Sequence, residues 1–257
     1  MANKNKNYST KKQELALVAG NSRLHWAWFE GNCLIETWDT PHLSKKIQNN
    51  LIPAKFLLPK FIKQNLTLIP IKIASVVHKQ TEFWENYATF QVITLKDIKL
   101  NNIYATLGID RALAVWAAGE TYNYPCLVID GGTALTFTGV NKQKELIGGA
   151  ILPGLRSQFI TIKQKTADKP RVELPPNLPP RWASDTKNAI ASGIIYTAIA
   201  GIYSYIETWL QKYSDSRIIL TGGDAEILLE YIAQQYPDLR SKLNCDRNLI
   251  FYGINLV

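Results

Sequence analysis

Apolar runs of strand length, separated by polar turns, recur in two parts of the chain. The first run covers residues 15–29 and is interrupted by Gly20-Asn21-Ser22, and the turn Gly31-Asn32 precedes another run at 33–40. Apolar runs bounded by short Gly and Asn turns are typical of β-hairpins. The pattern therefore predicts three consecutive antiparallel strands near the start of the chain.

The same pattern returns in the second half of the chain. Apolar runs at 125–130, 134–140 and 145–152 follow one another, with Gly131-Gly132-Thr133 between the first two. Gly132 lies 112 residues after Gly20, at the matching place in the pattern, although few residues are identical. A repeat of pattern indicates two copies of one supersecondary unit.

The segments between and after the two copies predict strands that alternate with helices, since their periodicity changes between capping and breaker residues. We expect strands at 66–77, 91–95, 217–221 and 248–255, and helices at 110–120, from about 154, at 185–213 and at 224–236. Hairpins followed by strand–helix alternation, twice, predict an α/β protein of two similar halves with a cleft between them. The predicted halves are residues 14–124 and 125–257, preceded by a disordered basic tail at 1–13.

The predicted helix at 185–213 is uncharged from residue 188 to 206, which is almost enough to cross a bilayer. Polar residues interrupt it, however, and no long apolar run lies inside it. Small residues at every fourth position predict one face that allows close backbone approach: Ala189, Gly193, Thr197 and Gly201. We therefore expect a helix buried between two layers, not a membrane span.

Composition places the chain among ordinary globular proteins, with 46% hydrophobic and 19% charged residues. No charged-then-apolar leader opens the sequence. Three distant cysteines fit neither a disulfide framework nor a zinc site, and the three histidines form no HExxH arrangement. These features predict a reduced, cytoplasmic protein.

The formal charge of +8 comes from two acid-free stretches that together hold eleven lysines, so the rest of the chain is slightly acidic. Four of these lysines lie in the first 13 residues and seven lie between Asp39 and Glu82. The second stretch interleaves lysine with apolar residues, which favours amphipathic elements with a solvated face over a nucleic-acid surface.

Three turns combine glycine with hydroxyl or acidic residues, and such turns can bind phosphate through backbone N–H groups. Each copy of the hairpin pattern contains one of them, and the third follows the predicted strand at 217–221. No Walker sequence or GxGxxG fingerprint is present. The turns are Ala19-Gly20-Asn21-Ser22-Arg23, Asp130-Gly131-Gly132-Thr133 and Thr221-Gly222-Gly223-Asp224.

Asp110 and Arg111 stand together at the start of the predicted helix 110–120. Asp110 fits an N-capping residue. It also fits a base that accepts a hydroxyl proton, while Arg111 holds an anionic substrate group. The sequence leaves both interpretations open.

Five motifs, in order, resemble those of the type III pantothenate kinases, which belong to the actin-like (ribonuclease H-like) superfamily of acetate and sugar kinases. The resemblance covers residues 15–256, and its specificity lies in the ordered set. The motifs are Gly108-Ile109-Asp110-Arg111, the DxGTA loop at 130–134, Gly148 to Gly154, Thr186 before Ser192-Gly193, and Thr221-Gly222-Gly223-Asp224-Ala225.

The resemblance implies an ATP-dependent kinase that phosphorylates the hydroxyl of pantothenate, the first step of coenzyme A biosynthesis. It implies Mg²⁺, a monovalent cation (K⁺ or NH₄⁺) held by Asp130, and a homodimer that binds substrate near the subunit interface. Asp110 takes the role of base. The implied substrate contacts are Gly108, Ile109, Asp110, Arg111 and Thr186, and the implied ATP contacts are Ala19, Gly20, Asn21, Ser22, Arg23 and Thr133.

The chain departs from the family pattern at its first loop, which usually begins with Asp in D-x-G-N-T. Val18 stands at that position and Ser22 replaces the Thr. The loss of the carboxylate leaves open which acid, Asp130 or Asp224, serves the metal. It also leaves as alternatives a non-catalytic regulator or nucleic-acid-binding protein on the same scaffold, and a related kinase with another hydroxylated substrate. The family's upstream Tyr position holds Asn101, and Tyr104 lies closer to Gly108.

Overall fold

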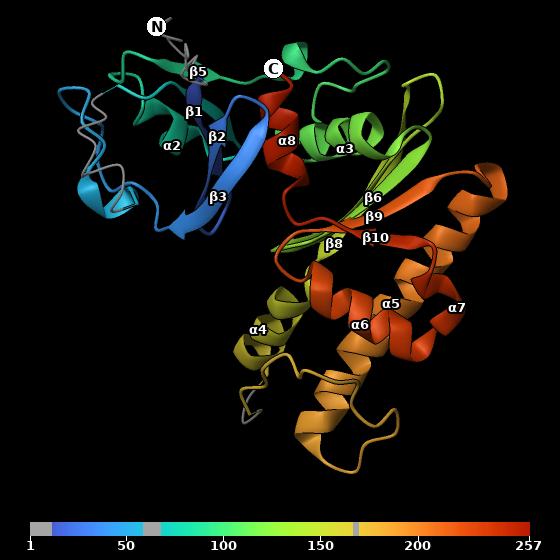
Figure 1. Cartoon of the computed structure of the whole chain (residues 1–257). Coiled ribbons are helices and arrows are strands. Elements are labelled where there is room, and N and C mark those ends of the chain that lie inside the picture. The colour runs from blue at the N-terminus through green and yellow to red at the C-terminus, as the bar shows by residue number, and fades with distance from the viewer. Residues whose placement is uncertain (1–11, 59–67, 167–169) are drawn as a thin grey trace, which may run out of the picture. The chain divides into compact units, whose positions relative to one another are not determined.

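The computed structural model describes residues 12–58, 68–166 and 170–257. The chain divides into two compact units between Thr94 and Leu95, with the last residue, Val257, grouped with the first unit. The described part of each unit contains a five-stranded sheet (Figure 1). Most of the predicted basic tail lies outside the described residues, and Gln13, which was predicted to belong to that tail, already begins the first strand.

The first sheet combines a three-stranded meander with two parallel strands. Every second residue of its strands points into one hydrophobic core, as Leu17 and Trp26 do. Trp84 packs in the same core. The order is β3-β2-β1-β4-β5. The strands are β1 (Gln13–Ala19), β2 (Leu24–Glu30), β3 (Cys33–Thr40), β4 (Ile71–Ser75) and β5 (Phe90–Val92); the short helices of this unit are η1 (Ala54–Phe56) and α2 (His78–Glu82).

The strand order of the second sheet is β10-β9-β6-β7-β8. Read in reverse, it is the order of the first sheet, with β6 in the place of β1. In both sheets the first three strands are antiparallel and the other two run parallel to the first. The strands are β6 (Cys126–Gly131), β7 (Ala134–Val140), β8 (Leu146–Pro153), β9 (Arg217–Thr221) and β10 (Leu243–Cys245). The prediction of two similar halves from the repeated pattern is confirmed.

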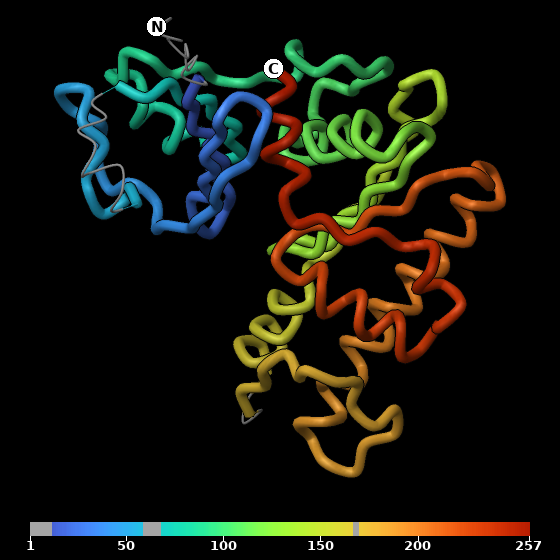
Figure 2. The backbone as a smooth tube through the Cα atoms, in the orientation of Figure 1, coloured from blue at the N-terminus to red at the C-terminus, as the bar shows by residue number. Residues whose placement is uncertain are grey.

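Helices cover both faces of the second sheet (Figures 1 and 2). One face carries α3 (Ile109–Tyr122) and α8 (Leu249–Asn255), and the other carries the apolar cluster shared with α4, α5 and α6. The helices of this second layer are α4 (Leu155–Lys165), α5 (Thr186–Lys212), α6 (Ala225–Gln235) and the short α7 (Pro237–Arg240); η2 (Leu95–Asp97) opens the unit.

The unit boundary differs from the one that the repeat predicts. The repeat places it near residue 124, where the second set of hairpins begins, whereas the compact units divide at 94 and 95. The physical reason is that α3 precedes the second sheet in sequence but packs on β6, β7 and α8.

The predicted strand at 248–255 is wrong, because this segment forms the helix α8. A short continuous apolar run does not distinguish a strand from a buried helix by periodicity. Packing decides here: a Cβ on Gly253 would lie 2.5 Å from the carbonyl oxygen of Leu113, so α8 approaches the backbone of α3 closely. The predicted strand at 66–77 begins among residues outside the described ranges, and its described part contains β4.

The predicted long helix is confirmed as α5, and Asp185 caps it by accepting a hydrogen bond from the backbone N–H of Asn188 (3.0 Å). Its small-residue face, however, is not buried against another layer of this chain. Ala189, Gly193 and Thr197 are exposed, and nothing lies within 4 Å of a Cβ placed on Gly193. The helix buries its isoleucine face instead, because large aliphatic side chains gain more from burial than small ones.

Among the described helices, α5 is the one with the length and hydropathy of a membrane span. Its isoleucines belong to the core of the second unit, as in the buried helix of a soluble protein.

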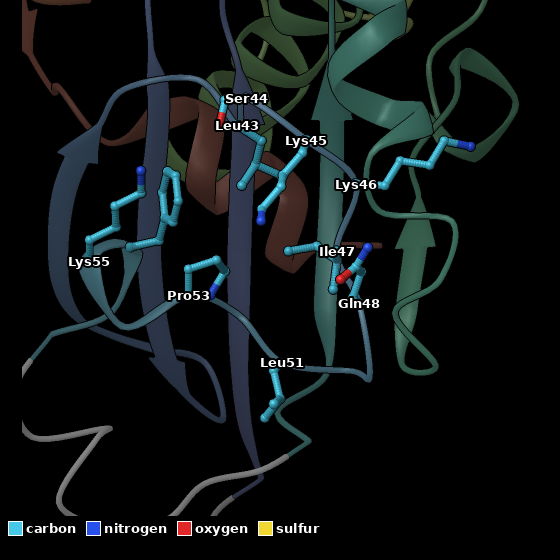
Figure 3. Close-up of a pocket in the computed structure, with 10 residues that line it drawn as sticks. Leu43, Ser44, Lys45, Lys46, Ile47, Gln48, Leu51, Pro53 and Lys55 are labelled. Atoms are coloured by element: carbon cyan, nitrogen blue, oxygen red, sulfur yellow. The ribbon is translucent and has the colours of Figure 1, made fainter.

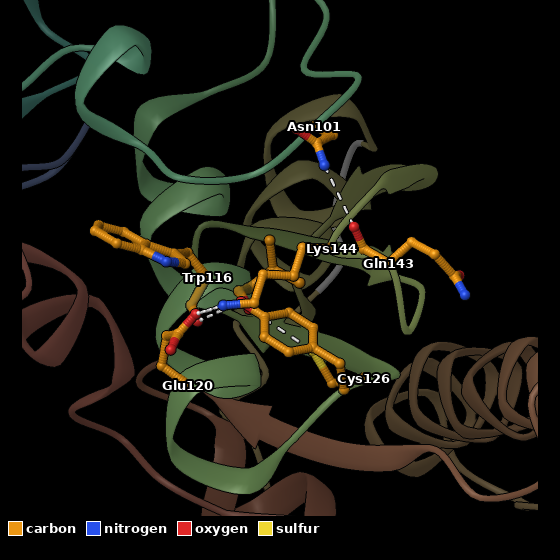
Figure 4. A network of polar contacts seen from close by, with 8 residues as sticks. Asn101, Trp116, Glu120, Cys126, Gln143 and Lys144 are labelled. Carbon is orange, nitrogen blue, oxygen red and sulfur yellow. Dashed lines mark hydrogen bonds and ion pairs between the residues drawn. The ribbon is translucent and has the colours of Figure 1, made fainter.

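A network of hydrogen bonds connects the segment before α3 with the turn between β7 and β8 (Figure 4). Asn101 exchanges backbone hydrogen bonds with this turn, donating to Lys144 O (2.8 Å) and accepting from Leu146 N (2.9 Å). Lys144 Nζ also pairs with Glu120 at 2.6 Å. The start of α3, where Asp110 and Arg111 lie, is therefore held in a fixed place beside the second sheet.

Candidate active site

Two parallel strands of the second unit, β6 and β9, end side by side, and both predicted loops at their carboxyl ends meet there. Asp130 near the end of β6 lies opposite Thr221 at the end of β9. The backbone N–H of Asp224 donates to Gly131 O at 2.8 Å and so ties the two loops together. Ligands of open α/β sheets bind at such carboxyl edges.

Close backbone approach at this edge requires two of the glycines. Gly222 has a φ of 87°, and a Cβ there would lie 2.2 Å from Asp130 Oδ1. A Cβ on Gly154 would lie 2.0 Å from Gly132 O, at the point where Gly154 N donates to Thr133 O (2.9 Å). The β6–β7 loop is therefore enclosed by the loop after β9 and by the start of α4.

Asp130 is a partly buried carboxylate to which no described residue donates a hydrogen bond. Burial raises its pKa to about 7, and the nearby charge of Asp110 raises it further. Burial destabilises the charged form of a carboxylate that has no partner, and a bound cation would stabilise that form.

Asp110 lies in the first turn of α3, and Gly108 is the N-cap. The N-capping interpretation is therefore wrong. Its Oδ1 accepts a hydrogen bond from the backbone N–H of Arg111 at 2.8 Å and folds back over Gly108, where a Cβ would lie 2.4 Å away. The positive end of the helix dipole favours a carboxylate here. The charge of Asp110 also contributes to the raised pKa of Asp130.

Arg111 is buried, with 7% of its surface exposed, and each guanidinium nitrogen donates to a neutral acceptor. Nε donates to Thr138 Oγ1 (3.0 Å), Nη2 to Phe137 O (2.9 Å) and Nη1 to the Tyr104 hydroxyl (3.2 Å). No described carboxylate forms an ion pair with it. These three bonds use three of five N–H groups, so the side chain is held rigidly with donors to spare for an anion.

Asp224 differs from Asp130 because its carboxylate already has a partner. Arg156 Nε of α4 donates to Asp224 Oδ1 at 2.8 Å, and only 5% of the Asp224 side chain is exposed. Of the two acids that the sequence offers for the metal, Asp130 is the one without an ion pair among the described residues.

The described residues contain no group of three or more His, Cys, Asp or Glu side chains that could hold a metal ion. A site of one or two carboxylates still fits Mg²⁺, which in phosphoryl-transfer sites takes its other ligands from substrate phosphates and water. Asp130, with Asp110 beside it, meets that requirement.

The first loop, in the first unit, is the turn between β1 and β2. Gly20 N donates to Arg23 O at 3.1 Å, and the side chains of Asn21, Ser22 and Arg23 are exposed, whereas Ala19 is buried. His42 Nε2 donates to Gly20 O at 2.8 Å. Arg23 pairs with Asp39 at 3.0 Å.

Thr186 is not brought together with Asp110. It is the first residue of α5 and is exposed. Figure 1 shows the start of α5 at the end of the second unit opposite α3. The other residues predicted in the second unit, Gly108, Ile109 and Thr133, lie at the start of α3 and in the β6–β7 loop.

Sequence reasoning missed Arg156 and Ser157, which contact this site. Ser157 Oγ donates to Thr133 O at 2.7 Å. Both follow Gly154 at the start of α4, so the glycine–helix signal at 154 could have directed attention to them. Their partners lie on other elements and carry no local signal.

A hollow of about 190 Å³ lies in the first unit between residues 43 and 56 (Figure 3). Its lining is apolar with a lysine rim and includes none of the predicted site residues. It therefore does not belong to the site described above.

Two sheets of one strand order, with glycine turns at their strand ends, form an actin-like α/β fold. Solved structures are similar in fold. A Baf family protein from Campylobacter jejuni matches with a TM-score of 0.59 at 21% identity over 93% of this chain and 94% of that one. The activator of the 2-hydroxyisocaproyl-CoA dehydratase from Clostridium difficile, with bound ADPNP, matches with a TM-score of 0.52 at 8% identity over 95% and 93%.

The chain belongs to the type III pantothenate kinase family. The model of that family matches residues 14–208. A type III pantothenate kinase of Nostoc sp. is 46% identical over 96% of this chain and 95% of that protein. One of Synechocystis sp. is 42% identical over 95% and 90%. The resemblance inferred from the motifs is confirmed, and the regulator alternative is not favoured.

Proposed function

We propose that the protein transfers the γ-phosphate of ATP to the hydroxyl of pantothenate, in the first step of coenzyme A biosynthesis. The observation that carries the proposal is the pair Asp110 and Asp130 beside the buried, rigidly held Arg111. Family membership supports pantothenate as the substrate, and these side chains support the roles proposed below.

In this mechanism Asp110 accepts the proton of the pantothenate hydroxyl as the oxygen attacks the γ-phosphorus, and the bond from that phosphorus to the β–γ bridging oxygen breaks, so that ADP leaves. The two remaining donors of Arg111 hold the pantothenate carboxylate, with the Tyr104 hydroxyl alongside. Asp130 would hold a cation, either the monovalent ion or Mg²⁺. When bound, Mg²⁺ offsets the negative charge that develops on the phosphate oxygens. Phosphoryl transfer depends mainly on such positioning and charge compensation.

A homodimer would account for Thr186, which has no place near Asp110 within one chain. The exposed, uncharged face of α5 is formed by Ala189, Gly193 and Thr197 and permits close helix approach. Tyr205, 48% exposed, lies further along the same helix. We propose that a second copy covers this face and supplies its Thr186 to the substrate site. We also propose that the protein works in the cytoplasm.

Dimerisation is tested by replacing Thr197 with Arg, which places a charge on the small-residue face. We expect the molar mass measured by light scattering to fall from that of a dimer to that of a monomer. The control Glu230→Arg, at an exposed position on α6, should keep the molar mass of a dimer. A wild-type protein of one chain in solution would contradict the dimer.

The activity is tested by incubating purified protein with ATP, Mg²⁺ and pantothenate, and measuring phosphopantothenate by mass spectrometry. A panel of other hydroxylated acids and sugars is run alongside. We expect product with pantothenate and K⁺ or NH₄⁺. Product from another acceptor but not pantothenate would favour the related-kinase alternative, and no turnover by folded dimer would favour the regulator.

A further inference from the structure

Beside the first loop, a histidine and a carboxylate lie outside the predicted set of ATP contacts. His25 on β2 lies opposite Val18 of β1 on one side and opposite Asp39 of β3 on the other. The three residues form one row across the sheet, on the face away from the tryptophan core. The single carboxylate of the row is therefore two strands away from the loop strand.

This juxtaposition depends on a β-bulge. Glu30 pairs with Cys33 at the hairpin turn, and that register would place His25 opposite Trp38. The register shifts by one residue at Trp28 and Phe29, which brings Asp39 opposite His25 and onto the same face. Bulges redirect side chains in this way next to functional sites.

His25 and Asp39 form a close pair. The Nδ1 atom of His25 lies 2.7 Å from Asp39 Oδ1, and because a carboxylate only accepts, Nδ1 carries a proton. Asp39 Oδ2 accepts from Arg23 at 3.0 Å. One carboxylate thus orients both side chains, as an orienting Asp does for the histidine of catalytic dyads.

The other ring nitrogen of His25 faces the loop. A Cβ placed on Gly20 would lie 3.5 Å from His25 Nε2, and no described residue forms a hydrogen bond with Nε2. His42 fixes the carbonyl of Gly20 from another direction. Val18, the neighbour of His25 in the row, is apolar, so its side chain cannot form a hydrogen bond with Nε2. The ring is therefore oriented, partly exposed and directed toward the backbone of the first loop.

We propose that His25, oriented by Asp39, donates a hydrogen bond from Nε2 to a phosphate oxygen of the nucleotide bound at the first loop, with Arg23 as a second cationic contact. The inference rests on the proposed function only in taking the ligand of this loop to be a nucleoside triphosphate. Where the family pattern has a carboxylate at the position of Val18, this chain presents a cation to the phosphates. His25 is a binding residue in this account, and Asp39 is a positioning residue.

The test is the affinity for AMP-PNP measured by calorimetry in the full-length protein with Mg²⁺. We expect His25→Ala to weaken AMP-PNP binding about tenfold or more, and Asp39→Asn to weaken it about threefold, since each loses one charge-assisted contact or its support. His78→Ala serves as the matched control, because that histidine lies 92% exposed on α2 and outside the loop.

Adenosine distinguishes phosphate recognition from a structural role. If His25 contacts phosphate, His25→Ala leaves adenosine binding within twofold of wild type. Equal loss of adenosine and AMP-PNP affinity, or unchanged AMP-PNP affinity in a variant with an unaltered melting temperature, would overturn the inference. Because no pantothenate is present, the result is independent of whether this substrate is phosphorylated.

Discussion

The two sheets share one strand order but distribute their charges differently. In the second sheet the row across the loop reads Thr221, Asp130, Thr136 and Ile151, so the carboxylate stands on the loop strand itself. The matching row of the first sheet reads Ala74, Val18, His25 and Asp39. The carboxylate lies on the third strand there and contacts Arg23 and His25.

This difference separates the tasks of the two loops. An unpaired carboxylate with a raised pKa attracts cations, whereas oriented His and Arg side chains attract anions. Both sheets contain the same hairpin, and the side chains around its turn differ. We therefore expect changes in the second unit to affect catalysis and cation dependence, and changes in the first to affect nucleotide affinity.

The largest effect is expected for Asp110→Asn. The amide cannot accept the hydroxyl proton, so kcat should fall by about 10²–10⁴-fold, the usual contribution of a positioned base. Nucleotide affinity should be unchanged. Steady-state kinetics measure both, with Asp215→Asn, an exposed acid in the turn before β9, as control. A loss of less than tenfold would remove Asp110 from the role of base.

Asp130→Asn should change the pH dependence of stability. In the wild type the folded pKa, about 7, exceeds the unfolded one, so the folded state binds the extra proton and loses stability as pH rises from 4 through 7. Without K⁺ or Mg²⁺, we expect the variant to be more stable than wild type by on the order of 2–4 kcal/mol at pH 8 and equal at pH 4. Urea unfolding at the two pH values measures the free energy of unfolding of both proteins. The same difference between variant and wild type at pH 4 and pH 8 would contradict the prediction.

Gly222→Ala should destabilise the protein by about 1–3 kcal/mol, because alanine is strained at a positive φ and its Cβ would displace the Asp130 carboxylate. The matched control is Gly193→Ala on α5, where the Cβ meets open space and a helical alanine is favourable. Thermal unfolding compares the two. A Gly222→Ala variant as stable as wild type would show that the close approach is not required.

The smallest effect is expected for Arg111→Lys. Lysine keeps the charge but loses the planar fork that bonds Thr138, Phe137 O and Tyr104. We expect the KM for pantothenate to rise about tenfold, with the KM for ATP unchanged. If both constants rise together, Arg111 has a general structural role instead.

Much of the fold could be predicted from the sequence, because hairpins and amphipathic helices leave local signals. The repeated turn pattern gave both sheets, and capping residues gave the ends of α5. The segment 248–255 could not be assigned, since its apolar run is equally compatible with either structure and only the contact between Gly253 and Leu113 decides. The exposed face of α5 was assigned to the interior for a similar reason: small residues fit a close contact but do not show that one is made.

The site was predictable where motifs are contiguous and not where partners are distant. Asp110, Arg111 and Asp130 stand in short motifs. The acceptors of Arg111 lie on β7 and, in the case of Tyr104, in the segment before α3. The pairing of Asp39 with His25 depends on a bulge. Neither can be derived from spacing along the chain, because a register shift of one residue moves a side chain to the opposite face.

The central claim is that the second unit provides the cation-dependent chemistry. The most direct test measures phosphopantothenate formation by wild type and Asp130→Asn at saturating ATP, Mg²⁺ and pantothenate, with and without K⁺. The account predicts that K⁺ stimulates the wild type and leaves the residual rate of the variant unchanged. Equal stimulation of both proteins, or a wild type that forms product equally well without K⁺, would contradict it.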